Sequence, residues 1–424
     1  MRAEPTPGRD ISAFALDLAP WMDDLYDPEV GLLWNPPGSF DGDGLRAGSV
    51  HLVPQSGWYA VSLAARGDGD RLATVVDALL ARQHHAPGEA WDGTFARFGE
   101  WPEPTVGAVE WEDYDPNWRQ FLGTTLTLLL RRHRDLLDPG RAARIEDAVR
   151  RAVAGEPEGR LAWHYTNIAL QHAWLLVEWG DADAGHALAE TIVGRWREHR
   201  TFPEFNSPTY DGIDLWGLAL WRGHSSSDRL RAWGAELEAG LWQTIASRYH
   251  AGLRNLAGPY TRAYGLDLGR HVGLLGVWIG AAAGMDAAAL PPLGAERVVA
   301  HSHDLLATPA VARAGTKAPA VVVGALQRFG GTERLVHDVI TARPTHREAT
   351  AWLAPHVMVG AEGGESDWQG WYQFVAGTVH WRRPDGSIGV LRYVPDGPPR
   401  GRAEPGLLRV GGPGRIEVHE PSPD

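Results

Sequence analysis

The chain has 424 residues, of which 44% are hydrophobic and 22% are charged, so it is long enough for two or three domains with large cores. No stretch approaches the roughly eighteen uninterrupted apolar residues of a membrane-spanning helix, and a net charge of −13 does not attract a nucleic acid backbone. Cysteine is absent, which excludes disulfides, thiolate metal sites and cysteine nucleophiles.

Apolar residues at spacings of three and four predict helix after helix up to about residue 290. Two kinds of predicted helix alternate along the chain. The amphipathic helices, expected on the outside, are Ile11–Leu25, Asp70–Gln83, Gly140–Ala154, Ala182–Glu198 and Ser227–His250. The nearly apolar helices, expected inside, are Gly57–Ala65, Trp118–Leu130, Ile168–Trp179, Ile213–Trp221 and Val272–Gly284. The inner helices recur about every 50 residues, which favours an (α/α) toroid of about five helical hairpins, possibly incomplete; a superhelical solenoid is the alternative.

Short β-branched runs separated by Gly, Pro and Asp follow from about residue 300 and predict strands. They are Ala320–Gly324, His356–Gly360, Gly377–Arg382, Ser387–Val394, Leu407–Val410 and Arg415–His419. The segment Arg383–Gly386 contains an Asp-Gly turn signal and predicts a hairpin. We therefore expect an α+β protein, with a toroid domain over residues 1–295 and an antiparallel β-sheet or sandwich domain over residues 296–424.

The segments that lead into the inner helices are rich in polar and aromatic residues. Because all inner helices of a toroid run the same way, these segments should meet at one mouth. Helix capping explains their Ser, Thr, Asp and Pro residues, but not the recurring Tyr and Arg. The composition suits a carbohydrate, since aromatic rings stack on sugars and concave sites between helices bind ligands. The expected substrate contacts are Trp58, Asn117, Trp118, Arg119, Tyr165, Asn167, Tyr260 and Asp211.

Two strings, Asn206–Asp214 and Gly258–Gly265, resemble motifs of uncharacterised toroid proteins. In layout, nearly the whole chain resembles the polysaccharide lyases of the chondroitin, heparinase and alginate lyase type, in which a helical toroid precedes an antiparallel β domain. The resemblance implies a lyase that cleaves a uronic-acid-containing poly- or oligosaccharide by β-elimination, with neither metal nor cofactor.

Such an elimination needs a group that neutralises the uronate carboxylate and groups that remove and return a proton. The candidate neutralisers are Asn206 and Asn167 with Arg262, and the candidate bases and acids are Tyr210, Tyr264 and His164. We prefer Asn206 with Tyr210, because they lie four residues apart across a Ser-Pro turn. A polyanionic substrate also requires an arginine-rich mouth, expected around Arg119 and Arg262.

Two other functions compete with elimination. A glycoside hydrolase would use two carboxylates, and among Asp113, Asp115, Glu204, Asp211 and Asp214 the most plausible pair is Asp115 with Asp211. A carbohydrate-binding protein without catalysis would need only the aromatic mouth. A homo-oligomer is possible in either case. The first ten residues contain no apolar segment typical of a signal peptide, so we expect a cytoplasmic protein, or a secreted one if a leader has been trimmed.

Histidines form three weaker patterns. His301, His303 and Asp304 have spacing typical of metal ligands, and His84 adjoins His85, but a histidine pair without a nearby third ligand is usually accidental, so no metal is expected. His380 alternates with Val379 and Trp381 in a predicted strand, and we expect it to face solvent rather than the mouth.

Overall fold

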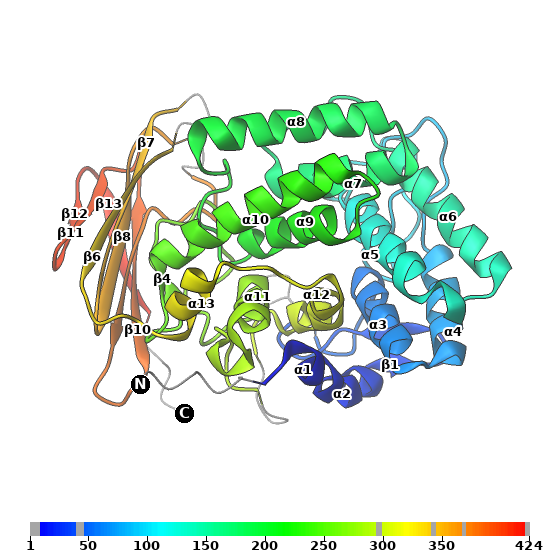
Figure 1. Ribbon diagram of the computed structural model, residues 1–424, viewed down its shortest axis with the longest axis horizontal. Helices are drawn as coiled ribbons and strands as arrows, with labels where there is room; N and C mark the ends of the chain where they lie inside the picture. The colour runs from blue at the N-terminus through cyan, green and yellow to red at the C-terminus, as the bar shows by residue number, and fades with distance from the viewer. Residues whose placement is uncertain (1–8, 40–45, 294–298, 341–344, 367–369, 420–424) are drawn as a thin grey trace.

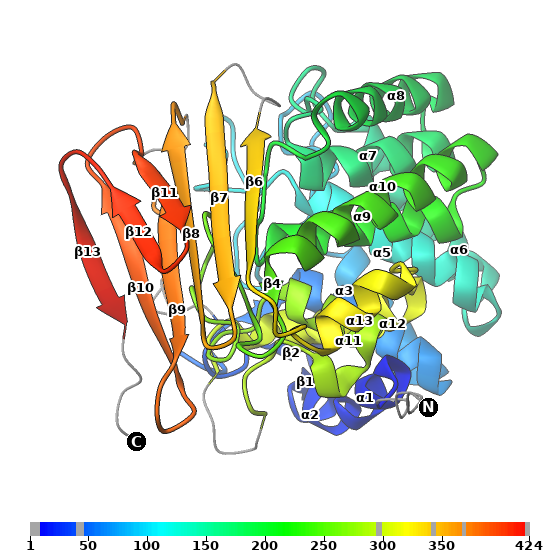
Figure 2. The same ribbon diagram turned by 60° about the vertical axis from the view of Figure 1, so that its left-hand side comes forward.

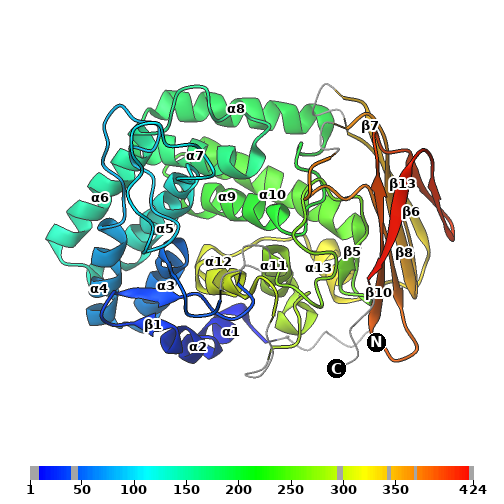
Figure 3. The same ribbon diagram turned by 180° about the vertical axis from the view of Figure 1, so that it is seen from behind.

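The computed structural model describes residues 9–39, 46–293, 299–340, 345–366 and 370–419 (Figure 1). Helices fill one side of the molecule, and a single antiparallel sheet stands as a layer beside them, as the views from the front and from behind both show (Figure 3). The expected α+β fold class is confirmed. Among the described helices, none is long and apolar enough to cross a membrane.

Six helices form the inner layer, and each is buried on most of its surface. They are α3 (Val53–Arg66), α5 (Trp118–His133), α7 (Thr166–Trp179), α9 (Tyr210–His224), α11 (Leu274–Ala283) and α12 (Thr308–Ala314). Each contacts the next in this order, and α12 contacts α3 again, so the contacts close on themselves. The sequence predicts the first five of these helices, because apolar residues on all faces indicate burial.

An outer helix packs beside each inner one. The outer helices are α1 (Ile11–Asp17), α2 (Ala19–Asp24), α4 (Gly69–Leu80), α6 (Pro139–Ala154), α8 (Ala182–His199), α10 (Asp228–Arg248) and α13 (Ala320–Gln327). The pairs are α3 with α4, α5 with α6, α7 with α8, α9 with α10, α11 with α13, and α12 with α1. In α6, for example, Ile145, Val149 and Val153 face inward at spacings of four. Three short 3-10 helices complete the set: η1 (Arg134–Leu136), η2 (Met285–Ala287) and η3 (Ser302–Ala307).

Six antiparallel strands form the main sheet in the order β13-β10-β9-β8-β7-β6 (Figure 2). Their bounds are β6 (Arg334–Ile340), β7 (Arg347–Ala354), β8 (Val357–Gly364), β9 (Gly377–Arg382), β10 (Ile388–Pro395) and β13 (Gly414–His419). β9 and β10 form the predicted hairpin, with Ile388 opposite Arg382 and Gly386 at a φ of +87° in the turn. The sequence predicts neither β6 nor β7.

Smaller strand pairs accompany the main sheet. β11 (Gly401–Glu404) pairs with β12 (Leu407–Val410). In the helical part, β1 (Tyr26–Asp27), β2 (Leu32–Trp34) and β3 (His51–Leu52) form one small sheet, and β4 (Tyr249–His250) pairs with β5 (Asn255–Leu256).

The predicted strand at Ala320–Gly324 is wrong, because this segment opens helix α13. Its three valines are not buried together: Val322 is buried with Leu326, four residues later, whereas Val321 is 77% exposed. That spacing is helical, and Pro319 fits the position before a first turn. The boundary expected between residues 295 and 296 lies outside the described residues, but helices η3, α12 and α13 continue the helical part well beyond it.

The segment between β5 and α11 joins the sheet to the helices. Tyr260 and Val375 exchange backbone hydrogen bonds of 2.9 Å, and the Ala263 N–H donates to the Gln373 carbonyl at 2.9 Å. A Cβ atom on Gly360 would lie only 1.9 Å from the Gly258 carbonyl oxygen, so this close approach requires glycine. Against expectation, His380 faces neither solvent nor a mouth: it is fully buried and its Nε2 lies 2.7 Å from the Leu266 carbonyl oxygen.

Candidate functional site

A cavity of about 790 Å³ lies where α3, α5, α7 and α9 begin. The 3-10 helix η3 and the segment before β9 complete its wall. All five segments that the sequence analysis singles out contribute to the lining. The lining residues are Gln55, Trp58, Arg97, Trp111, Asp115, Asn117, Trp118, Phe121, Arg160, His164, Tyr165, Asn167, Ile168, Glu204, Thr209, Tyr210, Ile213, Arg262, Tyr264, His301, His303, Asp304, Trp371, Tyr372 and Gln373.

Most of the candidate site residues lie together in this cavity. They are Trp58, Asn117, Trp118, His164, Tyr165, Asn167, Tyr210, Arg262 and Tyr264. The sequence analysis misses another group, which comprises Arg97, Arg160, Trp371, Tyr372 and Gln373. The last three precede β9 and reach the cavity only because the sheet packs against the segment after β5, so no local pattern marks them.

Asn206 does not line the cavity, which corrects the preferred neutraliser. It is 3% exposed, and its side-chain amide donates to the carbonyls of Ala257 and Pro259 at 2.8 and 2.7 Å. On sequence alone, Asn206 and Tyr210 are both expected to face the mouth, because they lie four residues apart across a Ser-Pro turn into a helix. Helix α9 begins at Tyr210, and Asn206 lies before it in a left-handed turn with a φ of +53°, from which its side chain reaches backbone carbonyls instead of the cavity.

Three expected substrate contacts also lie outside the cavity lining. Arg119 has no exposed surface, and its guanidinium donates to backbone carbonyls, including that of Asp92 at 2.9 Å. Tyr260 is 1% exposed, and its hydroxyl donates to the Leu256 carbonyl. Asp211 is 2% exposed and accepts a hydrogen bond from the Ser207 N–H at 3.0 Å. Each of these polar groups fixes a buried backbone segment.

Arg262 organises one wall of the cavity through hydrogen bonds. Its Nη1 donates to Glu204 Oε1 at 2.8 Å, its Nε donates to Gln373 Oε1 at 2.8 Å, and its Nη2 donates to the Tyr210 hydroxyl. The other carboxylate oxygen of Glu204 accepts from the Asn167 side-chain amide at 2.6 Å. The guanidinium is therefore committed to these partners rather than presented to a ligand.

The network ends at a hydroxyl in the cavity. The Tyr210 and Tyr264 hydroxyl oxygens are 2.7 Å apart, and Tyr264 is 43% exposed whereas Tyr210 is 9% exposed. Because the Tyr210 oxygen accepts from Arg262, its one hydrogen is available for Tyr264. The hydrogen of Tyr264 can then point into the cavity. This order of donors makes Tyr264 the member of the pair that can exchange a proton with a ligand.

The pKa shifts of Tyr210, Tyr264 and Arg262 indicate which of these groups carries a charge. Burial raises the pKa of the Tyr210 phenol well above its usual value, and burial likewise raises the pKa of Tyr264, although the Tyr210 hydrogen bond and Arg262 oppose this. Burial alone would lower the pKa of Arg262, but Tyr210 and Glu204 hold that pKa above its usual value. Arg262 thus stays a cation that polarises the neighbouring hydroxyl.

Two cavity carboxyl groups have perturbed acidity. Burial raises the pKa of Asp115 to about 6 and that of Asp304 to about 7. Asp211, the partner expected for Asp115 in a hydrolase, faces away from the cavity, so the proposed Asp115/Asp211 pair is wrong. Asp113 is exposed and accepts from the Val109 N–H at 2.7 Å, and it does not line the cavity.

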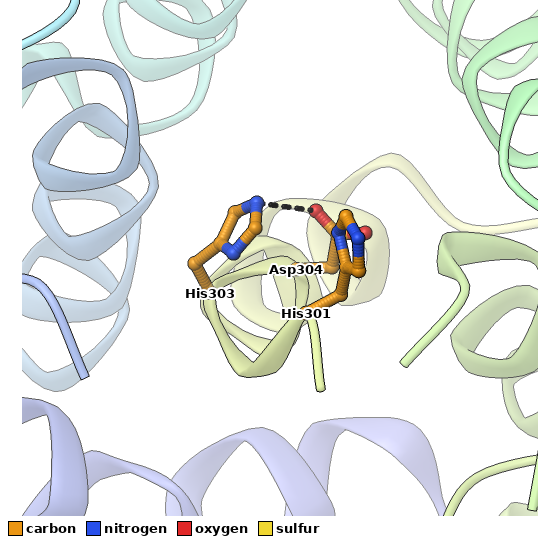
Figure 4. A group of neighbouring side chains, drawn as sticks. All are labelled: His301, His303 and Asp304. Carbon is orange, nitrogen blue, oxygen red and sulfur yellow. Dashed lines mark ion pairs between the residues drawn. The ribbon is translucent and has the colours of Figure 1, made fainter. Parts of the chain in front are cut away.

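The cavity lining also brings His301, His303 and Asp304 together (Figure 4). One potential ligand atom from each lies within 4.8 Å of the others, and His303 Nε2 is 3.5 Å from Asp304 Oδ1. The Tyr264 ring stacks on His301 with a centroid distance of 4.8 Å and an interplanar angle of 28°. The spacing of these residues is visible in the sequence, but their approach to Tyr264 is not.

A model of the family described as "Domain of unknown function (DUF8769)" matches residues 14–315. The chain belongs to this family. The match includes every inner helix, the Glu204, Tyr210, Arg262 and Tyr264 side chains and η3, and it ends just after α12. The sheet and the Trp371–Gln373 segment lie beyond it. A search of curated proteins finds no match.

Proposed function

We propose that this protein is a carbohydrate-active enzyme that cleaves a uronic-acid-containing poly- or oligosaccharide by β-elimination. We further propose that its inner and outer helices form an (α/α) toroid, followed by an antiparallel β domain. The closed series of contacts from α3 through α12 supports the toroid. The cavity then lies at the end of the toroid where the inner helices begin, as the lyase resemblance implies.

The observation that carries the proposal is the Tyr264 hydroxyl, exposed in the cavity and linked through Tyr210 to Arg262. Elimination breaks the C–H bond beside the uronate carboxylate and then the C–O bond to the leaving sugar. Tyr264 is placed to return a proton to the leaving oxygen, and its phenolate would be stabilised by the Tyr210 hydroxyl and, through it, by Arg262. We therefore assign two successive roles to Tyr264 and a positioning role to Tyr210. As the phenolate, Tyr264 takes the proton from the C–H bond, and as the resulting phenol it returns that proton to the leaving oxygen.

The cavity lining suits an acidic sugar chain. The indoles of Trp58, Trp111, Trp118 and Trp371 offer apolar faces to sugar rings. Arg97 brings positive charge to the cavity of a protein that is negative overall, and Arg160 is paired with Glu156 through two hydrogen bonds. Arg160 also donates to Asn117 Oδ1 at 3.1 Å, and the Asn117 amide donates to the Tyr165 hydroxyl at 2.7 Å. A uronate carboxylate can therefore meet the Arg97 guanidinium and an oriented amide.

A panel of uronic-acid polymers and oligosaccharides, with neutral glycans as controls, tests the proposal. Ultraviolet absorbance reports the conjugated unsaturated uronate, and a second assay reports reducing ends. We expect both signals to rise together, and Tyr264→Phe to lower the rate by about 100-fold or more while substrate binding persists. Tyr372→Phe removes a cavity hydroxyl that reaches the Arg262 network only through Gln373 Nε2, at 2.7 Å, and it should change the rate only a few-fold. Full activity of Tyr264→Phe would refute the assignment.

Hydrolysis is the second candidate function, and the raised pKa of Asp115 favours it. A carboxyl group with a pKa of about 6 stays protonated to a higher pH than an ordinary aspartate, and its protonated form can donate to a glycosidic oxygen. Reducing ends without ultraviolet absorbance, lost in Asp115→Asn but not in Tyr264→Phe, would establish this function instead. Binding of acidic oligosaccharides without either signal would support a binding protein.

A further inference from the structure

His301, His303 and Asp304 project from the start of η3 to the same side of the chain (Figure 4). His303 is 7% exposed, and all three line the cavity. They are therefore sheltered from bulk water and still face a space that a small ion can enter. Among the described residues, this is the group of three whose ligand atoms approach closely enough to share a metal.

The distance between two of these groups fits a bridging ion. Tetrahedral ligands with metal bonds of 2.0–2.1 Å lie about 3.4 Å from each other. His303 Nε2 and Asp304 Oδ1 are 3.5 Å apart, which is longer than an ordinary N–H···O hydrogen bond. The third ligand atom, from His301, lies within 4.8 Å of both and requires only a side-chain adjustment to close the set.

The backbone that carries these ligands is fixed by distant contacts. The His301 N–H donates to the Gly38 carbonyl at 2.8 Å, the Ser302 hydroxyl donates to the Pro37 carbonyl at 2.7 Å, and the Val272 N–H donates to the Ala300 carbonyl at 2.9 Å. His301 itself has a φ of +55°, a left-handed conformation that favours glycine. Retaining an imidazole in that conformation is typical of a functional position.

We propose that His301, His303 and Asp304 bind one divalent transition-metal ion, with zinc as the preferred occupant. Two imidazoles and one carboxylate suit zinc and neighbouring first-row metals, whereas magnesium and calcium prefer oxygen ligands throughout. Three protein ligands leave a fourth position, which opens on the cavity beside Tyr264. This is the arrangement of a site that also binds water or substrate, not of a closed structural site.

Metal binding can be measured on the full chain, without a polyhistidine tag and without any sugar. After chelator treatment and removal of the chelator, titration with Zn²⁺ is followed by calorimetry and titration with Co²⁺ by visible absorbance. We expect one ion per chain and cobalt bands of a four-coordinate or five-coordinate site. His303→Ala and Asp304→Ala should each weaken Zn²⁺ binding by about 100-fold or more, because each removes a direct ligand.

Two further variants keep the test decisive. His164→Ala removes another imidazole of the same cavity and should leave binding unchanged. His301→Gly suits the positive φ, so it should fold even where circular dichroism shows that His303→Ala does not, and it should still lose the ion. The proposal is overturned if the unaltered chain binds no Zn²⁺, or if His301→Gly binds it as tightly as the unaltered chain.

The role of the ion in catalysis is a separate matter and rests on the proposed elimination. In that reaction the ion would neutralise the uronate carboxylate, the task that the sequence analysis assigns to Asn206. Removal of the ion should then abolish elimination while Tyr264→Phe leaves Zn²⁺ binding intact. Zinc binding without elimination activity would retain the metal site and reject only the proposed function.

Discussion

Four of the outer helices begin in a different way from their inner partners, whereas α1, α2 and α13 also lack a side-chain cap. Helices α4, α6, α8 and α10 each begin beside a side chain that accepts a hydrogen bond from the first turn, namely Asp68, Asp138, Asp181 and Ser227. The N-cap residues of α3, α5, α7 and α9 make no such bond. Helix α7 is instead held by Glu204, 37 residues further along the chain, which accepts from the Asn167 N–H.

This difference distinguishes polar residues that only cap a helix from polar residues that belong to the cavity. A polar residue at an outer start is accounted for by capping, a local interaction. At an inner start some polar groups, such as Asp211, also bond locally, but Asn167 belongs to a network that joins segments distant in sequence and ends at the cavity. Substitutions at the starts of inner and outer helices should therefore change stability by different amounts. The following three tests measure these changes.

The largest effect on stability should follow from Glu204→Ala. Glu204 is 1% exposed, and its loss would leave the buried Arg262 guanidinium without its counter-charge. Breaking such a pair costs about 3–5 kcal/mol of unfolding free energy. The matched surface pair is Arg197 with Glu236, at 2.6 Å, and Glu236→Ala should cost less than about 1 kcal/mol. Urea unfolding of both variants tests this, and equal losses would contradict it.

Asp211→Asn should show an effect that depends on pH. Burial raises the pKa of Asp211 to about 8, so between about pH 4 and pH 8 the folded protein holds a proton that the unfolded chain has lost. The contribution of this group to stability is complete below its unfolded pKa and is lost as the pH rises through 8, by up to about 1.4 kcal/mol per pH unit.

Asparagine has no such titration, and its amide oxygen can still accept from the Ser207 N–H. We therefore expect Asp211→Asn to gain stability relative to the unaltered chain by a few kcal/mol between pH 5 and pH 8. Thermal or urea unfolding at several pH values measures this difference. Parallel stability curves for the two proteins would show that the carboxyl group of Asp211 does not carry the shifted pKa.

The smallest effect on stability should follow from a substitution at the start of the outer helix α8. Asp181 accepts hydrogen bonds from the N–H groups of Asp183 and Ala184 at 3.0 and 3.1 Å. Asp181→Ala should cost about 1 kcal/mol, and Asp181→Ser, which keeps an N-cap oxygen, should recover most of it. Neither variant should alter carbohydrate or Zn²⁺ binding. A change in binding would show that outer starts are coupled to the cavity.

The sequence predicts secondary structure well where a pattern within a short stretch of chain determines it. The 3.6-residue periodicity places ten helical segments close to their observed positions, and the Asp-Gly turn correctly predicts the β9–β10 hairpin. The failure at α13 has the same origin, because three consecutive valines satisfy a strand pattern as readily as a buried helical turn. Only packing against α11 and α10 distinguishes them.

The sequence predicts the positions of individual side chains less well than the positions of segments. The sequence places five segments at one site, but it cannot say that Asn206 and Arg119 turn toward backbone carbonyls while Asn167 and Arg262 meet through Glu204. Side-chain direction in the turns before helices depends on backbone angles, and distant contacts set those angles. His301, His303 and Asp304 were recognised only as a spacing for the same reason.

The sequence by itself determines the α+β class, the alternation of buried and half-exposed helices and the segments that carry polar aromatic residues, because these follow from periodicity and composition along a short stretch of chain. The tertiary structure decides which hydroxyl faces the cavity, which arginine forms an ion pair with Glu204, and that His301, His303 and Asp304 meet beside Tyr264. Those outcomes join residues as far apart as Arg262 and Gln373, and only the packed fold brings such residues within bonding distance.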